Sequence, residues 1–327
     1  MRVILWVCLA LGVAWGGYWF VGARAVESGV AQWFAATAAN GVIATNQSVS
    51  VAGFPSRFDL TVTEPHLADP ASGWGWRAPF AQVFSMTWKP WHLIAALPND
   101  QEIDAPGQKI MLHSTALKGS LRLHPSTDLT LAEIVIEGHD LAATSDLGWT
   151  IGAKSLLFAI AEDTTQKNAQ HLGLDATDLT PDANLTTQLP RLGDRITTLH
   201  LDATLLLTAA IDRHIAETQP KLAGIKLKDF HGVWGTLKIS AAGDILRAPE
   251  GYADGKIDVQ IEDWRQIPKL VVALGLVQPG MEKSIERGLE LLANSGPDPT
   301  VLALPLEFKS GQMNLGPLPL GPAPMLN

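Results

Sequence analysis

Residues 255–261, GKIDVQI, alternate apolar and polar side chains without a break. A period of two places the apolar residues of such a segment on one face of a β-strand and the polar ones on the other. The same alternation recurs at residues 117–123, 199–207 and 233–239. Because the second face of these runs carries polar residues, the pattern favours an antiparallel sheet over a doubly wound parallel one. We therefore predict a mainly β chain with helical insertions (α+β), folded as an elongated antiparallel, curved or groove-like sheet.

Turn-forming residues separate the predicted strands, at 53–56, 124–126, 242–244 and 309–311. Helical patterns occupy residues 207–219, 264–276 and 281–294. The proline- and glycine-rich run 304–324 favours an edge strand followed by an extended segment. No linker shows a shift in composition, so we predict one exported β-rich domain over residues 42–327.

The N-terminal segment is long and apolar enough for a membrane helix. Val3 to Gly22 carry no charge, and twenty helical residues span about 30 Å, the thickness of a bilayer core. The alternative is a cleaved signal peptide, because Ala23-Arg24-Ala25 has the form of a cleavage site. The apolar run exceeds the ~7–15 residues of the apolar region of an ordinary signal peptide, and only Arg2 charges the segment before it, which favours an uncleaved transmembrane anchor over residues 1–24.

A short amphipathic helix is predicted next, over residues 25–41. Its apolar stripe includes Val26, Val30 and Phe34, and Asn40-Gly41 is a suitable stop. No lysine or arginine holds this flank in the cytoplasm between Arg24 and Arg57, which favours export of the large C-terminal part. In a Gram-negative bacterium the protein would be a single-pass inner-membrane protein with its C-terminal domain in the periplasm.

Composition excludes several classes of protein. The 327 residues carry a net charge of −9, which argues against a nucleic-acid binder. Charged residues make up 17% of the chain, against about 25% in ordinary soluble domains. The one cysteine, Cys8, excludes disulfides within the chain and thiolate metal clusters.

Sequence motifs typical of catalytic, metal-binding or nucleotide-binding sites are weak throughout the chain. The closest histidines, His113 and His124, are eleven residues apart, too far for two metal ligands on one element. The acidic run 100–104 lacks the glycine and glutamate of a calcium loop. The glycine pattern 73–78 carries two tryptophans and does not follow a predicted strand, and 251–256 has the wrong spacing for a phosphate loop. We therefore predict no enzyme, no cofactor and no metal.

The candidate contact residues are aromatic, apolar or basic. The simplest interpretation of the tryptophans is packing in the protein core, and the alternative is an apolar surface that contacts lipid. Arg57 should begin a strand and pair with a carboxylate or a lipid phosphate. Leu205 and Val259 should lie on the dry face of the sheet. The candidate lipid or partner contacts are Arg57, Trp74, Trp76, Trp88, Trp91, Leu205 and Val259.

Several motifs resemble those of the domain of unknown function 2125 family, DUF2125, exported proteins known mainly from alphaproteobacterial genomes. They are the N-terminal span, residues 53–58, residues 88–98, Gly235-Thr236-Leu237 with Gly243-Asp244, and residues 305–320. Ser56 stands where the family often has an aromatic residue. The resemblance carries no established activity and no functional residue. An anchor followed by long β segments is also similar to AsmA-like envelope proteins, some of which form grooves for phospholipids.

The leading hypothesis is a membrane-anchored periplasmic envelope protein that offers an apolar groove for lipid binding or transfer. The first alternative is a non-enzymatic structural or assembly factor that binds another envelope protein through the same surface. The second is a hydrolase with a scattered site. An open apolar face would favour lipid, and a face filled by the helices at 264–276 and 281–294 would favour an ordinary core.

Overall fold

The computed structural model describes residues 1–326, and it is mainly β, with 51% strand and 22% helix. The chain forms two compact units where the sequence suggested one domain. The first unit comprises Met1–Pro125 and Ile136–Gly148, and the second Ser126–Val135 and Trp149–Asn327. The strands pair antiparallel in both, as predicted.

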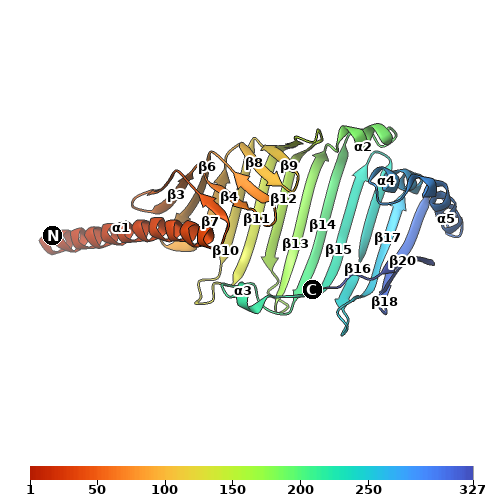
Figure 1. Cartoon of the computed structure of the whole chain (residues 1–327). Helices are drawn as coiled ribbons and strands as arrows, with labels where there is room; N and C mark the ends of the chain where they lie inside the picture. Colours follow the sequence, from red (N-terminus) through yellow and green to blue (C-terminus); the bar gives the residue numbers. More distant parts are fainter. Residues whose placement is uncertain (327) are drawn as a thin grey trace. The chain divides into compact units, whose positions relative to one another are not determined.

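Helix α1 (Arg2–Ala39) joins the predicted anchor and the predicted amphipathic helix into one element (Figure 1). Good helix formers at Ala23-Arg24-Ala25 continue the backbone through the expected boundary. The helix ends at Asn40, before Gly41 with φ +88°, as the sequence predicts. By length and composition, α1 is able to cross a membrane.

The remainder of the first unit consists of two antiparallel ladders. The first ladder pairs, in order, β2 (Ser48–Ala52), β3 (Arg57–Thr63), β6 (Phe80–Met86), β7 (Lys89–Leu97) and β10 (Ala116–Leu123). The second pairs β1 (Ile43–Thr45), β4 (His66–Asp69), β5 (Trp74–Arg77), β8 (Asp100–Ala105), β9 (Gln108–His113) and the end of β11 (Leu131–Ser145).

Helix α1 packs on strands of both ladders through two buried clusters. Trp19 and Ala23 pack against Phe58 of β3. Nearer the C-terminal end of the helix, Phe34 packs against Ala44 and Val62. These contacts fix the helix to the β structure from Trp19 to Phe34.

The second unit is built on seven long strands that pair in chain order (Figure 1). They are β12 (Thr150–Glu162), β13 (Ala169–Leu179), β14 (Ile196–Leu207), β15 (Leu222–Trp234), β16 (Leu237–Arg247), β17 (Ala253–Glu262) and β18 (Val301–Lys309). Short strands β19 (Gln312–Leu315) and β20 (Leu318–Pro322) continue the sheet, so the proline-rich end is strand as well as extended chain.

Helices flank the strands of the second unit. They are α2 (Ala183–Gln188), α3 (Ile215–Thr218), η1 (Trp264–Gln266), α4 (Ile267–Ala273), η2 (Pro279–Met281) and α5 (Glu282–Asn294). The helices predicted at 264–276 and 281–294 are thus confirmed. The helix predicted over 207–219 is wrong except for its last turn, because Leu207 stays in β14 and pairs with Leu222.

Buried clusters of the second unit lie at the two ends of the strands. At one end, Trp234 and Leu237 pack with Leu189 and Leu192, and Trp264 packs with α5. At the other end, the buried cluster is made of Ile245, Ala253, Phe308, Ala323 and Leu326. The core is therefore divided, and the middle of the strands contributes few residues to it.

Two glycines explain two wrong predictions. The alternating run 233–239 is a hairpin, because Gly235 turns the chain between β15 and β16 with φ +57°. The turn predicted at 242–244 is the middle of β16. Gly243 has φ +152° there, and a Cβ on it would lie 2.2 Å from the carbonyl oxygen of Lys256.

We predict that Gly243→Ala destabilises the second unit by about 2–4 kcal/mol, because the new methyl group would force β16 and β17 apart and the backbone angle is unfavourable. Gly173→Ala in β13 is the matched control, since a Cβ there meets nothing within 4 Å. Thermal unfolding of the full chain in detergent measures both. Equal melting temperatures for the two variants would contradict the role assigned to Gly243.

Candidate functional site

The seven strands of the second unit carry one apolar face whose residues align in rows across the sheet. The register places apolar residues in two adjacent rows at the middle of the strands. The first row is Phe158, Leu174, Leu201, Phe230, Ala241, Val259 and Leu304. The second is Ile160, Leu172, Ala203, Leu227, Gly243, Ile257 and Leu306. We call these two rows the trough.

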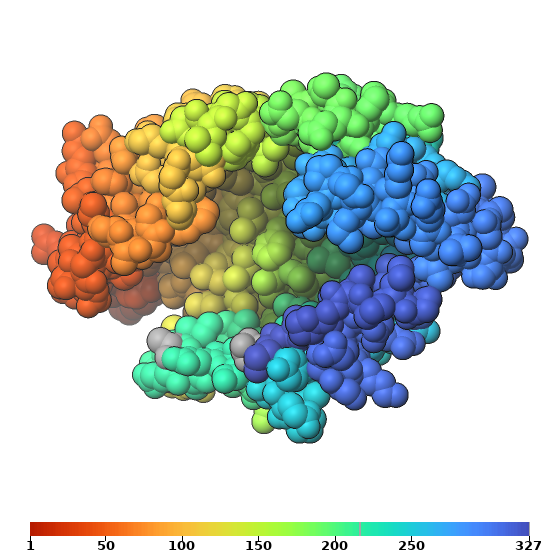
Figure 2. All heavy atoms as spheres, turned by 45° about the vertical axis from the view of Figure 1, so that its right-hand side comes forward, coloured from red at the N-terminus to blue at the C-terminus, as the bar shows by residue number. Residues whose placement is uncertain are grey.

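The trough is lined but not covered. All seven residues of the first row are half-buried and none is buried, although every neighbour in the row is apolar. A face covered by a second layer would bury such residues fully. Figure 2 shows the surface hollowed between α4 and α5, in light blue, and the C-terminal segment, in dark blue. The predicted helices therefore cover one end of the apolar face and leave its centre open.

Leu205 and Val259 occupy the face that the sequence predicts for them. Val259 lies in the first row of the trough, and Leu205 lies one position outside it, paired with Gln170 and Ile225. Both are half-buried. Their strands are three spacings apart, about 14 Å, and Leu205 lies four residues further along β14 than the row of Val259. The two positions are therefore about 19 Å apart, and one long apolar ligand would be able to reach both.

The opposite face of the same strands is polar. On β17 it carries Lys256, Asp258 and Gln260, all exposed. At its centre, cross-strand pairing stacks His200 on His231 with ring centroids 4.8 Å apart, and His200 Nδ1 lies 2.6 Å from Asp175 Oδ1. The two faces thus differ in chemistry as strongly as the sequence period suggests.

The hydrogen bond with Asp175 raises the pKa of His200 above its ordinary value, and the charges of Asp175, Asp229 and Asp202 add to the effect. The folded chain therefore binds the His200 proton more tightly than the unfolded chain. The resulting stability is complete below the unfolded pKa, about 6.5, and is lost as pH rises through the raised folded pKa. Solvent screening limits its size, because the imidazole is near the surface.

We predict that His200→Gln lowers the melting temperature more at pH 5.5 than at pH 8, because the stability that the raised pKa of His200 contributes is lost as the pH rises. Asp175→Asn should show the same pattern, because it removes the principal partner. Melting curves of the three proteins at both pH values provide the measurement. A loss that is equal at pH 5.5 and pH 8 would contradict the assignment.

In the first unit, Arg57 lies at the start of β3, after the tight turn predicted at 53–56. Its Nη2 donates to Asp59 Oδ2 at 2.7 Å, and its side chain is 51% exposed. The predicted strand and the predicted carboxylate partner are both confirmed. The partner is local, two residues along the same strand.

The four tryptophans do not form a single cluster on one ladder. Trp88 lies in the turn between β6 and β7 and is exposed, and Trp91 lies on β7 and is half-buried. Trp74 and Trp76 lie on β5, in the second ladder. Trp74 is exposed, whereas Trp76 Nε1 donates to Gln101 Oε1 at 2.9 Å. The core interpretation therefore fits Trp76 better than Trp74 or Trp88.

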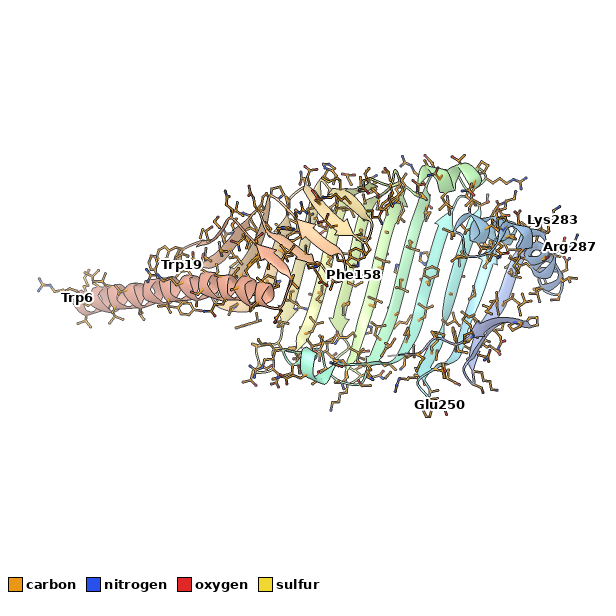
Figure 3. All side chains as sticks on the ribbon, viewed as in Figure 1. Trp6, Trp19, Phe158, Glu250, Lys283 and Arg287 are labelled. Carbon is orange, nitrogen blue, oxygen red and sulfur yellow. The ribbon has the colours of Figure 1, made fainter. Side chains whose placement is uncertain are left out.

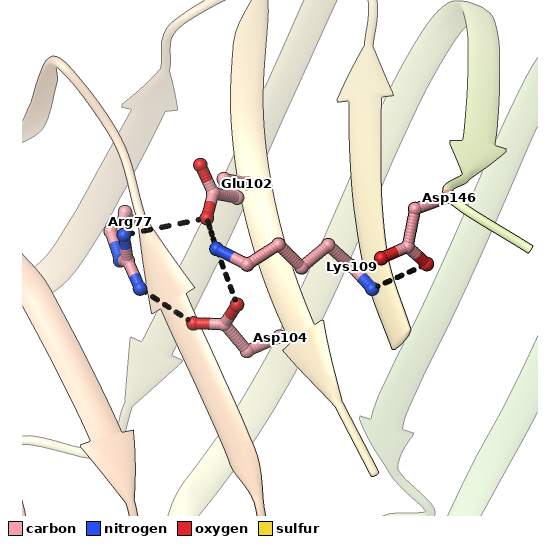
Figure 4. A network of polar contacts seen from close by, with 5 residues as sticks. All are labelled: Arg77, Glu102, Asp104, Lys109 and Asp146. Carbon is pink, nitrogen blue, oxygen red and sulfur yellow. Dashed lines mark hydrogen bonds and ion pairs between the residues drawn. The ribbon is translucent and has the colours of Figure 1, made fainter. Parts of the chain in front are cut away.

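The acidic run 100–104 is strand β8, and its Glu102 and Asp104 are paired with cations (Figure 4). Arg77 Nη2 lies 3.0 Å from Asp104 Oδ2, and Lys109 Nζ lies 2.9 Å from Glu102 Oε1. The hydrogen bond to Glu102 raises the pKa of Lys109. Within residues 1–326, no group of three or more histidine, cysteine, aspartate or glutamate side chains is arranged to hold a metal ion.

A second surface of interest joins α1 to two turns of the first ladder, residues 53–56 and 87–88. Trp15 Nε1 donates to the Pro55 carbonyl at 2.9 Å, and Trp19 Nε1 donates to the Arg57 carbonyl at 2.7 Å. Tyr18 Oη donates to the Thr87 carbonyl at 2.8 Å. Figure 3 labels Trp19 where α1 meets the strands, and Trp6 on the part of the helix that extends beyond them. We call residues 53–56 and 87–88 the helix-side turns.

Sequence reasoning did not identify these three donors as functional residues. Only the packing of α1 on the first ladder reveals their carbonyl partners, which belong to Pro55, Arg57 and Thr87. Sequence reasoning also missed Phe158, Leu174 and Phe230 in the trough. Phe158 and Leu174 belong to strands whose alternation is less regular than that of residues 255–261.

One family model matches the chain, over residues 19–324, and its description is "Uncharacterized protein conserved in bacteria (DUF2125)". The match includes both units and the second half of α1. No curated protein and no solved structure matches the chain.

Proposed function

We propose a lipid-binding role for this chain, which belongs to the uncharacterised bacterial family DUF2125. In this proposal α1 anchors the protein in the inner membrane, and the remainder of the chain lies in the periplasm as an envelope protein. The trough holds the acyl chains of a membrane lipid. The function is binding or transfer and not catalysis.

The observation that carries the proposal is the uncovered first row of the trough, from Phe158 to Leu304. Six strand spacings make this row about 29 Å wide. An extended acyl chain of sixteen carbons is shorter than that, so it fits along the row. Large apolar surfaces that stay exposed in a folded protein commonly mark binding sites.

The energetics favour a long apolar ligand over a small one. Removing a methylene from water contributes ~0.8 kcal/mol, so a sixteen-carbon chain would contribute roughly 10 kcal/mol before immobilisation costs. The trough offers this ligand no buried charge that would need a partner. Because α1 holds the chain at a membrane, the lipid supply is local.

A charge in the trough, or beside it on the same face, should abolish lipid binding. We predict that full-length Val259→Asp and Leu205→Asp, purified in mild detergent, lose co-purified lipid while keeping their circular dichroism spectra. The control is Gln260→Asp, next to Val259 on the polar face. In a closed core, the same aspartates would be buried without a partner and unfold the unit. Folded variants that retain wild-type lipid would contradict the proposal.

A bulky apolar side chain in the trough should also reduce lipid binding, because it would occupy the space of the ligand without adding a charge. Ala241 neighbours Phe230 and Val259 in the first row, so Ala241→Trp would fill the space of a ligand. Ala242→Trp on the opposite face is the control. We predict that mass spectrometry finds less lipid in the first variant alone. If the preparation instead contains a stoichiometric protein and no lipid, the face serves an envelope partner.

We predict that the mature protein retains α1. Cleavage after Ala25 would remove Trp19 and Ala23, which bury Phe58 of β3. The exposed aromatic surface would destabilise the first ladder. Intact-mass analysis of protein from membranes should give the full chain, and an N-terminus at Val26 would contradict the prediction.

A further inference from the structure

The length of α1 determines how deeply the helix-side turns would lie in a membrane that the helix crosses. Residues 3–14 extend free of the β structure, and at 1.5 Å per residue they span about 18 Å. The hydrocarbon core of a bilayer is about 30 Å thick. If α1 crosses the bilayer, its next turns must also lie within the membrane. Those turns carry Trp15, Tyr18 and Trp19, which bind the helix-side turns.

Irregular backbone is tolerated at such a depth only where its polar groups find partners in the protein. The helix-side turns meet this requirement unusually well. Two of their carbonyls, those of Pro55 and Thr87, and the carbonyl of the adjoining Arg57 accept hydrogen bonds from α1. The Ser56 carbonyl accepts from the Thr87 backbone N–H at 3.1 Å and from the Thr87 hydroxyl at 3.2 Å.

The carbonyl of Gly53 accepts from the backbone N–H groups of Ser56 and Arg57. In a turn exposed to water, solvent would satisfy most of these oxygens. Here the donors are side chains of the apolar helix and groups of the turns themselves. The arrangement is what a turn immersed in a low-dielectric layer needs.

The outer side of the same turns is apolar. Phe54 is 56% exposed, Trp88 is 52% exposed and Met86, at the end of β6, is 42% exposed. Phe54 stacks on Phe20 of α1 with ring centroids 5.8 Å apart, so the turn and the helix form one aromatic surface. Aromatic and apolar side chains of this kind collect at the boundary between headgroups and acyl chains.

A pocket of about 390 Å³ opens beside the helix-side turns. Its lining combines apolar side chains with basic ones, and consists of Arg57, Phe84, Ser85, Met86, Lys89, His92 and Ile94. Asp59 neutralises Arg57, whereas exposed Lys89 forms no ion pair within residues 1–326. The pocket therefore offers a free cation above an apolar floor, which matches an anionic headgroup with its first acyl carbons.

We propose that this edge of the first unit lies in the headgroup–acyl boundary of the bilayer that holds α1, and that its pocket binds one anionic phospholipid through Lys89. The inference rests on α1 crossing the membrane and does not depend on a ligand in the trough. Phe54, Met86 and Trp88 enter the membrane, and Lys89 faces the phosphate.

The depth is tested with a fluorescent label on the full chain in vesicles of phosphatidylcholine and phosphatidylglycerol. In a Cys8→Ala background, Trp88→Cys carries a nitrobenzoxadiazole label. Asn99→Cys, beyond the other end of β7 and about 36 Å away at the rise of an extended strand, carries the control label. We expect lipids with a nitroxide near the glycerol to quench the first label, and dithionite in the buffer to reduce only the second.

Equal, rapid reduction of both labels by dithionite would overturn the proposed depth. Should Trp88→Cys fail to fold, Met86→Cys gives a second labelling site on the same edge. Its label should behave as the label at position 88 does.

The lipid preference is tested by native mass spectrometry of the full chain with equal amounts of phosphatidylglycerol and phosphatidylcholine of the same acyl chains. We expect wild type to retain the anionic lipid preferentially. Lys89→Glu should reduce this preference about fivefold or more, as expected for the loss of one basic side chain at a membrane surface. Lys283→Glu, the same charge change on exposed α5 (Figure 3), should leave it unchanged.

Two results would overturn the assignment of the pocket. One is equal retention of the two lipids by wild type, and the other is an unchanged preference in Lys89→Glu. Val259→Asp separates this proposal from the trough: it should lose trough lipid and keep the preference for phosphatidylglycerol. Competition by inorganic phosphate alone would instead identify a free-phosphate site and contradict a lipid one.

Discussion

An antiparallel sheet with one apolar face is stable when other apolar groups cover that face. In the second unit the protein covers it only at the two ends of the strands. Trp234, Leu237 and the helices close one end, and Phe308 with the C-terminal residues closes the other. Between them the row through Leu201 stays half-buried. Apolar area of this extent is costly to leave in water. The proposed function follows from that imbalance, since an acyl chain would complete the core that the chain itself leaves open.

The period-two pattern made the strands and the two faces of the sheet predictable. Residues 199–207 and 255–261 became β14 and β17 with the apolar residues on one face, and Arg57 began β3 after its predicted turn. These predictions succeed because alternation is a local property. Cross-strand register is not local. The bulge between Leu227 and Phe230 decides that Phe230, and not Asp229, joins the row of Leu201.

Other features depended on long-range contacts that a sequence pattern does not contain. The sequence around Gly243 predicts a turn. In the structure, the close carbonyl of Lys256 shows that this glycine lets β16 and β17 approach each other. The continuous helix α1 gains its second half from packing on Val62 and Ala44. The division into two units also escaped prediction, because β11 begins in one unit and ends in the other without any change in composition.

The central claim, that the trough holds acyl chains, is tested most directly by photo-crosslinking. The full chain would be reconstituted with a phospholipid that carries a diazirine near the end of one acyl chain, irradiated, digested and sequenced by mass spectrometry. The account predicts adducts on the trough, at peptides containing Phe158, Leu201 or Phe230, and none on the polar-face residue His200. Adducts confined to α1, with none in the second unit, would contradict it.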